Sequence, residues 1–267
     1  MFDCDAGLGI PWKIDAPNSK LRVLEFDICS FGIIKFVCLP ELEKLDWDYW
    51  GPHDTPLSFG SVPSLRELVL SNCVGVNQHA FKLSDLLYGA TGIHTLTLDF
   101  EGENIWLQPE IEELTSAFSK LRKLFILGVF VEFDLVWITA FLEAAPSVEM
   151  LHIAVYENAC KVRNESIYPE RTNPHWELDF HGFKNMLLTE LKTLGFRPLE
   201  QQLAFIRAVL ERAPNLQTVV LNKDNKGCEH CDAITHNVPT RPAFPKNKEE
   251  RHMVARRVSD GTSFHSG

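Results

Sequence analysis

Large apolar residues recur along the chain in a short pattern whose first, fourth and sixth positions are apolar. The clearest copy is Val62 to Cys73, V-P-S-L-R-E-L-V-L-S-N-C, in which Leu65, Leu68 and Leu70 take these positions. Apolar residues that alternate with other residues at the fourth and sixth positions indicate a short strand with one buried face. The three leucines are therefore expected to point into a core, and the residues between them to face solvent.

The pattern occurs eight times, and it is regularly spaced. Its copies begin at positions 21, 42, 65, 93, 121, 148, 191 and 216, and six of the seven separations lie between 21 and 28 residues. The later copies are identified by Leu121-Leu124-Ile126, Val148-Leu151-Ile153, Leu191-Leu194-Phe196 and Leu216-Val219-Leu221. A proline stands two residues before the first position in four copies, where it ends one element and leads into the next strand.

Helical periodicity appears between the later strands, and the helices are expected at 78–87, 109–118, 135–144 and 199–212. A unit of 20 to 29 residues that consists of a strand and a second element, and that repeats along the chain, is typical of leucine-rich repeats. The sequence thus predicts an α/β leucine-rich-repeat solenoid, with a curved parallel sheet on its concave side and helices and loops on its convex side.

Three regions are predicted from this spacing. Residues 1–20 form a short N-terminal segment, residues 21–222 the repeat domain, and residues 223–267 a polar, partly disordered tail with a short helix at 248–258. The longest separation, 43 residues, contains a polar insertion at about 157–182.

Composition narrows the possible partners. A net charge of −10 in 267 residues argues against nucleic acid and against an anionic membrane surface. Seven scattered cysteines indicate a reducing compartment, and no segment reads as a signal peptide or a membrane span. We expect a cytoplasmic or nuclear protein that needs no cofactor.

The predicted concave strip carries the candidate binding residues. In each copy, one position of this strip lies between the second and third core residues, and the other lies directly after the third core residue. Acidic residues gather in the first repeats and apolar residues in the middle: Glu25, Asp27, Asp46, Asp48, Asp99, Phe125 and Leu127. In the seventh copy the same rule selects Gly195 and Arg197. One hypothesis is that a protein with a basic segment and an apolar anchor binds here. The other is that the acids only keep an exposed sheet soluble.

Enzyme signatures such as G-x-S-x-G, H-E-x-x-H and the P-loop are absent, so no catalytic residue is nominated. Cys228 and Cys231 form one C-x-x-C pair, whereas a structural zinc site needs four ligands. An incidental pair, a zinc site and a redox pair remain open, and the last two would make a metal- or redox-active protein. The tryptophans Trp47, Trp50, Trp106 and Trp137 lie beside repeat positions and are expected to fill the core.

Several strings resemble the leucine-rich-repeat region of plant F-box proteins, in particular the grass branch. They are F-E-G-E-N-I-W-L-Q-P-E (100–110), E-F-D-L-V-W (132–137), L-E-A-A-P-S-V-E (142–149), G-F-R-P-L-E-Q-Q (195–202) and F-I-R-A-V-L-E-R-A-P-N-L (205–216), with C-E-H-C (228–231) after the last repeat.

This resemblance implies the substrate-binding part of a ubiquitin ligase subunit, in which a helical F-box docks on a Skp1-type adaptor. No amphipathic helical pattern is visible in the twenty residues before Leu21, so the F-box and adaptor binding are expected to be missing. The sequence therefore predicts a protein–protein recognition module of unknown target, and a non-functional truncation is the remaining alternative.

Overall fold

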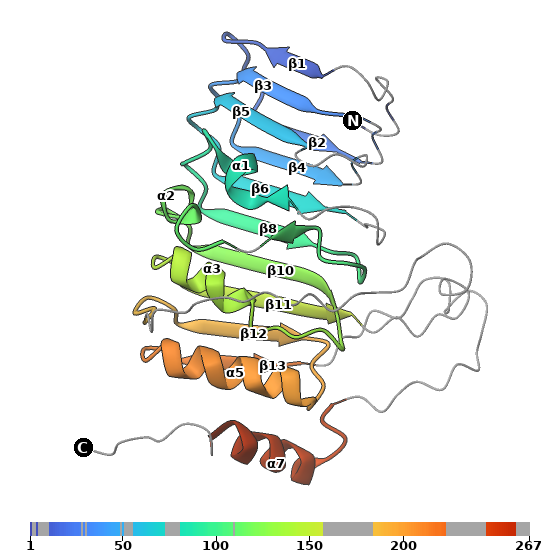
Figure 1. Ribbon diagram of the computed structural model, residues 1–267, viewed down its shortest axis with the longest axis vertical. Coiled ribbons are helices and arrows are strands. Elements are labelled where there is room, and N and C mark those ends of the chain that lie inside the picture. The colour runs from blue at the N-terminus through green and yellow to red at the C-terminus, as the bar shows by residue number, and fades with distance from the viewer. Residues whose placement is uncertain are drawn as a thin grey trace, which may run out of the picture.

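The computed structural model describes residues 1, 4, 11–27, 29, 31–48, 50, 56–72, 81–108, 110–156, 184–222 and 244–259. Eight parallel strands form one long sheet, in the order β13-β12-β11-β10-β8-β6-β4-β2, so that each repeat adds one strand beside the last (Figure 1). These strands are β2 (Val23–Phe26), β4 (Lys44–Asp48), β6 (Glu67–Ser71), β8 (Thr95–Asp99), β10 (Lys123–Phe130), β11 (Met150–Tyr156), β12 (Glu190–Leu194) and β13 (Thr218–Leu221). Each of the eight predicted copies supplies one strand.

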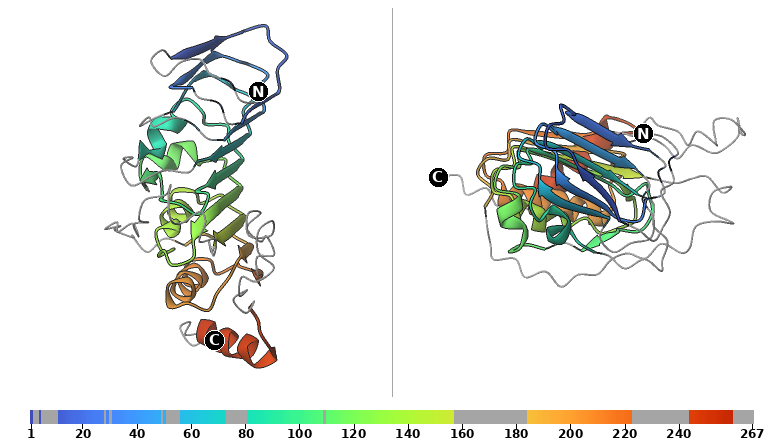
Figure 2. Two further views of the ribbon diagram at one scale, coloured as in Figure 1. Left: turned by 90° about the vertical axis from the view of Figure 1, so that its right-hand side faces the viewer. Right: turned by 90° about the horizontal axis from the view of Figure 1, so that it is seen from above.

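A second layer covers one face of this sheet, and its composition changes along the chain (Figure 2). Over the first repeats it is a three-stranded parallel sheet, in the order β1-β3-β5; over the later repeats it is helical. Its elements are β1 (Trp12–Asp15), β3 (Ile34–Cys38), β5 (Leu57–Ser61), α1 (Leu83–Leu87), α2 (Leu114–Ala117), α3 (Ile138–Ala144) and α5 (Glu200–Arg212), whereas α7 (Lys248–Ser259) packs against α5 beyond the last strand of the sheet. A two-stranded sheet of β7 (Phe81–Lys82) and β9 (Leu107–Gln108) completes it.

The helix predictions differ from the structure mainly in length. The helix expected at 135–144 begins at Ile138, and the one expected at 199–212 begins at Glu200. Those expected at 78–87 and 109–118 are reduced to the short helices α1 and α2. The tail helix expected at 248–258 is α7, and β1 lies within the segment 1–20.

The core lies between the two layers. The second apolar position of six consecutive repeats is fully buried, namely Leu45, Leu68, Leu96, Leu124, Leu151 and, because Leu191 pairs with Leu151, also Leu191. Burying such a side chain stabilises the fold by about 1.5–3 kcal/mol. The expected role of the tryptophans is confirmed, because Trp47, Trp50, Trp106 and Trp137 are all buried and contact other aromatic rings.

A backbone ladder joins the repeats at the start of the sheet strands. At each of the seven joints, one carbonyl oxygen accepts hydrogen bonds of 2.7–3.2 Å from two successive amides of the next repeat. The accepting residues are Arg22, Glu43, Arg66, His94, Arg122, Glu149 and Thr189. Consecutive repeats are thereby held in one register.

The pairing of β12 with β11 corrects the alignment that was predicted for the seventh copy. Leu191 pairs with Leu151 and Thr193 with Ile153, so the core triplet is Leu188-Leu191-Thr193 and not Leu191-Leu194-Phe196. Leu188 is fully buried, and Thr193 is 2% exposed. The true triplet escapes the apolar pattern because its third member is polar.

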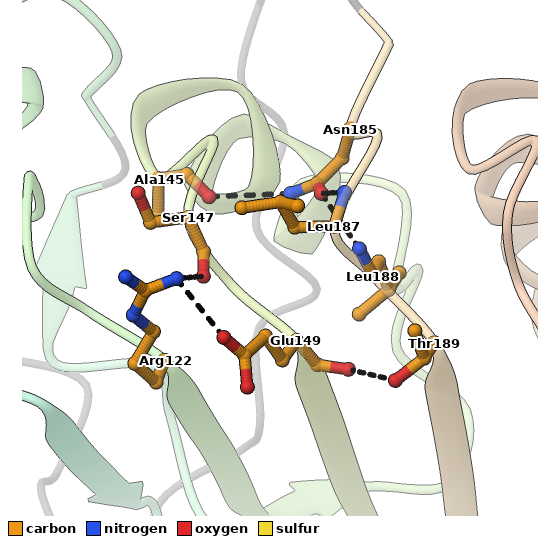
Figure 3. Close-up of polar contacts among 8 residues, drawn as sticks. All are labelled: Arg122, Ala145, Ser147, Glu149, Asn185, Leu187, Leu188 and Thr189. Atoms are coloured by element: carbon orange, nitrogen blue, oxygen red, sulfur yellow. Dashed lines mark hydrogen bonds and ion pairs between the residues drawn. The ribbon is translucent and has the colours of Figure 1, made fainter.

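Asn185 determines this register (Figure 3). In other repeats the first core residue donates its amide to the backbone oxygen three residues earlier, as Val148 does to Ala145. Here the Asn185 side-chain oxygen takes that role and accepts from the amides of Leu187 (3.1 Å) and Leu188 (2.9 Å). The chain thus re-enters the array through a side-chain turn.

The insertion predicted at about 157–182 and the pair Cys228/Cys231 lie outside the described residues, as does most of the tail. Within the described ranges, no helix is long and apolar enough to cross a membrane.

Candidate protein-binding face

The candidate site is the face of the eight-stranded sheet that points away from the second layer, called the strand face below. Because the strands are parallel and in register, equivalent side chains form rows across it. The middle row consists of Glu25, Asp46, Val69, Thr97, Phe125, His152, Lys192 and Val220. A row on one side of it consists of Val23, Lys44, Glu67, Thr95, Lys123, Met150, Glu190 and Thr218. The candidate residues Asp27, Asp48, Asp99 and Leu127 lie along the other side.

All seven candidate residues therefore lie on one face, but two others proposed for the strip do not. The corrected register replaces Gly195 and Arg197 by Lys192 and Leu194. Gly195 is buried and has a positive φ of 70°. Sequence analysis missed this because Leu191-Leu194-Phe196 fits the apolar pattern better than the triplet that is used.

A carboxylate group surrounds Lys44 on the first three strands. Its ammonium nitrogen lies 3.4 Å from Asp46 Oδ2 and 3.6 Å from the nearest oxygens of Glu25 and of Glu67. Partial burial lowers the pKa of Lys44, but the bond to Asp46 and the three negative charges outweigh it and raise the pKa overall. One positive charge among three carboxylates leaves this part of the strand face negative.

Asp48 belongs to a second carboxylate group, which lies toward the strand ends. Burial raises the pKa of Asp48 to about 6, with further contributions from the charges of Glu101, Asp27 and Asp46 and an opposing effect from Ser71. Its Oδ1 atom is buried and accepts no hydrogen bond from the described residues. Asp48 is thus a carboxylate that would gain from a cationic neighbour.

Glu101 is a member of this group that sequence analysis did not single out. Its carboxylate accepts a bond of 2.9 Å from the Ser71 hydroxyl, and its amide donates to Asp99 Oδ1 at 2.9 Å. Asp99 therefore shapes the turn that presents Glu101, and Glu101 extends the negative region. Glu101 lies two residues after the end of β8, beyond the alternating positions from which the strip was predicted, so the apolar pattern gave no signal for it.

Gly128 makes this arrangement possible. It has a positive φ of 63°, and a Cβ there would lie 2.2 Å from Asp99 Oδ1 and 2.4 Å from the Glu101 amide nitrogen. The pairing of β10 with β11 shifts between Ile126 and Val129. Glycine is required at this bulge because both the backbone conformation and the available space exclude a side chain.

The strand face becomes more apolar after β8. Phe125 is half-buried and packs edge-on against His152, with ring centroids 5.0 Å apart. His152 Nε2 in turn lies 2.6 Å from Glu190 Oε1. Leu127, Met150 and Leu194 are half-buried nearby. A half-exposed aromatic ring supported by a histidine is suited to holding an apolar side chain.

Among the described residues no cluster of His, Cys, Asp and Glu is arranged to hold a metal ion. A shallow depression of about 360 Å³ lies away from the strand face, next to the first turn of α5, and is lined by Glu132, Asp134, Val136, Glu200, Gln201 and Ala204. The strand face remains the surface on which charge and apolar groups are organised.

The repeated apolar triplet, the single parallel sheet and the second layer together define a leucine-rich-repeat protein. Residues 13–257 match the family model described as At1g61320/AtMIF1, LRR domain, and the chain belongs to this family. No curated protein and no solved structure matches the chain. Leucine-rich-repeat domains of this kind are protein–protein interaction modules.

Proposed function

We propose that the strand face binds a segment of another protein that carries basic residues at one end and a large apolar residue at the other. The observation that supports this is the division of the face. Carboxylates gather on β2, β4 and β6 and just after β8, and half-buried apolar groups gather on β10, β11 and β12.

The geometry gives the bound segment an approximate spacing. Neighbouring strands in a sheet lie about 4.8 Å apart, so three strand steps from β4 to β10 span about 14 Å. An extended chain rises about 3.3 Å per residue. A basic residue near Asp46 and an apolar residue on Phe125 would therefore be separated by about four residues.

Electrostatics would contribute mainly specificity and association rate. Exposed charges are screened by salt, so binding through the carboxylates should weaken as ionic strength rises. The apolar contact on Phe125 should be insensitive to salt. This difference separates the proposal from the alternative in which the acids only keep the sheet soluble.

A designed peptide tests the proposal. A fluorescent peptide with a Lys-Arg pair four residues before a leucine should bind the full chain more tightly than a peptide of scrambled sequence. Asp46→Asn combined with Asp48→Asn should weaken binding about five- to tenfold at 50 mM salt and reduce the salt dependence. Phe125→Ala should weaken binding by a similar factor without changing the salt dependence.

The matched control is Glu211→Gln, which removes a carboxylate from α5 that is 79% exposed. It should leave the affinity unchanged. The proposal fails if the double variant binds the peptide as the original chain does at every salt concentration.

A role as the target-recognition part of a ubiquitin ligase is a second proposal. It is supported by the resemblance of residues 195–202 and 205–216 to plant F-box proteins. We propose that this chain holds a target without itself binding the Skp1-type adaptor. Affinity capture tests this, because an adaptor that co-purifies with the chain would contradict it.

A further inference from the structure

The chain contains one pair of adjacent arginines, and a serine follows this pair at the end of α7. Arg256, Arg257, Val258 and Ser259 read R-R-V-S, and no other serine or threonine of the sequence has arginines both two and three residues before it. Serine kinases whose substrate groove is acidic select this arrangement, because each guanidinium group pairs with a carboxylate of the groove. The function proposed for the strand face leaves this motif unexplained.

The serine of the motif can be reached from solvent. Ser259 is the last residue of α7 and is exposed. Its hydroxyl donates a hydrogen bond of 2.9 Å to the carbonyl oxygen of Ala255, one helical turn earlier. Arg256 lies three residues before Ser259, hence on the same side of the helix, and is exposed as well. The hydroxyl group and one of the two arginines are therefore accessible while the helix is intact.

The second arginine is engaged in the contact between α7 and α5 (Figure 1). Arg257 forms an ion pair with Glu200 in the first turn of α5, and its backbone oxygen accepts a hydrogen bond of 3.0 Å from Arg207 Nε. Arg207 also bonds to Glu200 at 3.0 Å, and these two guanidinium groups, Arg207 above all, lower the pKa of the Glu200 carboxyl. Val254, one turn before Arg257, is 2% exposed. Half of the recognition motif is thus occupied as long as α7 is docked.

We propose that Ser259 is a phosphorylation site for an arginine-directed serine kinase, and that the phosphate releases α7 from α5. ATP is the phosphate donor. The Ser259 oxygen forms a bond to the γ-phosphorus of ATP, while the bond between this phosphorus and the oxygen that bridges it to the β-phosphorus breaks. ADP leaves with the electron pair of that bond, and the hydroxyl proton passes to the general base of the kinase.

The phosphate weakens the last turn of α7 in three ways. The Ser259 oxygen loses its hydrogen, so it can no longer donate to the carbonyl of Ala255. Close to two negative charges are added at the C-terminal end of a helix, where the helix dipole disfavours them. In the loosened turn, the phosphate competes with Glu200 for the guanidinium group of Arg257. The ion pair that holds α7 on α5 is therefore weakened.

Phosphorylation and docking exclude each other. The groove of the kinase takes both guanidinium groups, and Arg257 becomes accessible only when it leaves Glu200. The kinase therefore acts on the fraction of chains in which α7 is released, and the phosphate then keeps α7 released. The site lies at the end of the array and does not depend on the function proposed for the strand face.

Phosphorylation of the full chain tests the site itself. The catalytic subunit of cyclic-AMP-dependent protein kinase, with ATP, serves as the arginine-directed probe enzyme, and mass spectrometry locates the phosphate. We expect incorporation at Ser259, and Arg256→Ala should slow it about tenfold. The matched control is Arg251→Ala, which removes an exposed arginine from the same helix and should leave the rate unchanged.

A second experiment tests the coupling between the phosphate and the docking of α7. Glu200→Gln leaves the motif intact but weakens the ion pair with Arg257, so it should speed phosphorylation about threefold. Glu211→Gln, on the same helix, should not. After phosphorylation, the amides of α7 should exchange their hydrogens about tenfold faster, and those of α3 should be unchanged.

Two results would overturn the proposal. The first is a chain that takes up no phosphate at Ser259, or takes it up at the same rate after Arg256→Ala. The second is a phosphorylated chain whose α7 amides exchange no faster than before, because the phosphate would then leave the helix docked.

Discussion

The side-chain amide of Asn185 donates a hydrogen bond of 3.2 Å to the carbonyl oxygen of Ala145, forty residues earlier in the chain (Figure 3). Both residues occupy the same place in their repeats, three positions before the first core residue. The Asn185 backbone amide also donates to Arg212 O at 2.7 Å. One buried asparagine thus links the sixth repeat to the seventh and the seventh to α5.

Asn185→Ala should therefore be strongly destabilising. It removes the donor to Ala145 and the acceptor for Leu187 and Leu188, and it leaves buried polar groups without partners. We expect the free energy of unfolding to fall by about 3 kcal/mol, measured by urea denaturation. The control is Asn215→Ala, which removes an exposed bond to Met186 O and should cost less than about 1 kcal/mol. Equal effects of the two substitutions would contradict this role for Asn185.

Asp48→Asn should stabilise the protein at neutral pH. The folded pKa of Asp48 is about 6, and the pKa of an unfolded aspartate is about 3.9. The folded state therefore binds more protons between pH 4 and pH 6, so this residue lowers stability as pH rises through that window. Replacing it should raise the free energy of unfolding on the order of 1 kcal/mol at pH 7.5 and leave it unchanged near pH 4.

Urea denaturation at both pH values measures this effect. Glu211→Gln, on α5, should show no such pH-dependent difference. An Asp48→Asn protein that is less stable than the original at pH 7.5 would show that the carboxylate is stabilised where it lies.

Gly128→Ala should destabilise the fold and disturb the carboxylate group on the strand face. The added Cβ would collide with Asp99 and with the backbone of Glu101, and alanine resists a positive φ. A loss of about 2 kcal/mol is expected in thermal or urea unfolding. Gly128→Asn separates the two causes, because asparagine tolerates a positive φ but still carries a Cβ. If it restores the original stability, crowding against Asp99 is not the reason for the glycine.

The apolar triplets predicted the sheet well because six second positions, from Leu45 to Leu191, have no role other than to fill the core. The prediction failed at the seventh copy, where Leu188-Leu191-Thr193 competes with the more apolar Leu191-Leu194-Phe196. The register of the seventh copy depends on the turn at Asn185 and on the backbone carbonyl of Glu149. Neither of them contributes an apolar residue to the sequence pattern.

The strands of the second layer were also missed. Ile34 and Phe36 alternate with exposed residues, as do Leu57 and Phe59, which is the period of a strand. This signal was present, but the convex side of the array was expected to consist of helices and loops, and no strand was predicted there. On the candidate face, the positions of Asp46 and Phe125 followed from alternation. Glu101 could not be placed, since its orientation depends on the turn that Asp99 and Gly128 form.

The backbone ladder at the seven joints uses no side-chain atom. One carbonyl accepts two amides whether its residue is Arg22, His94 or Thr189, so the rise from one repeat to the next is indifferent to the residues displayed beside it. Evolution can therefore rewrite the surface of such an array one position at a time, or change the number of its units, while the spacing between recognition positions stays constant.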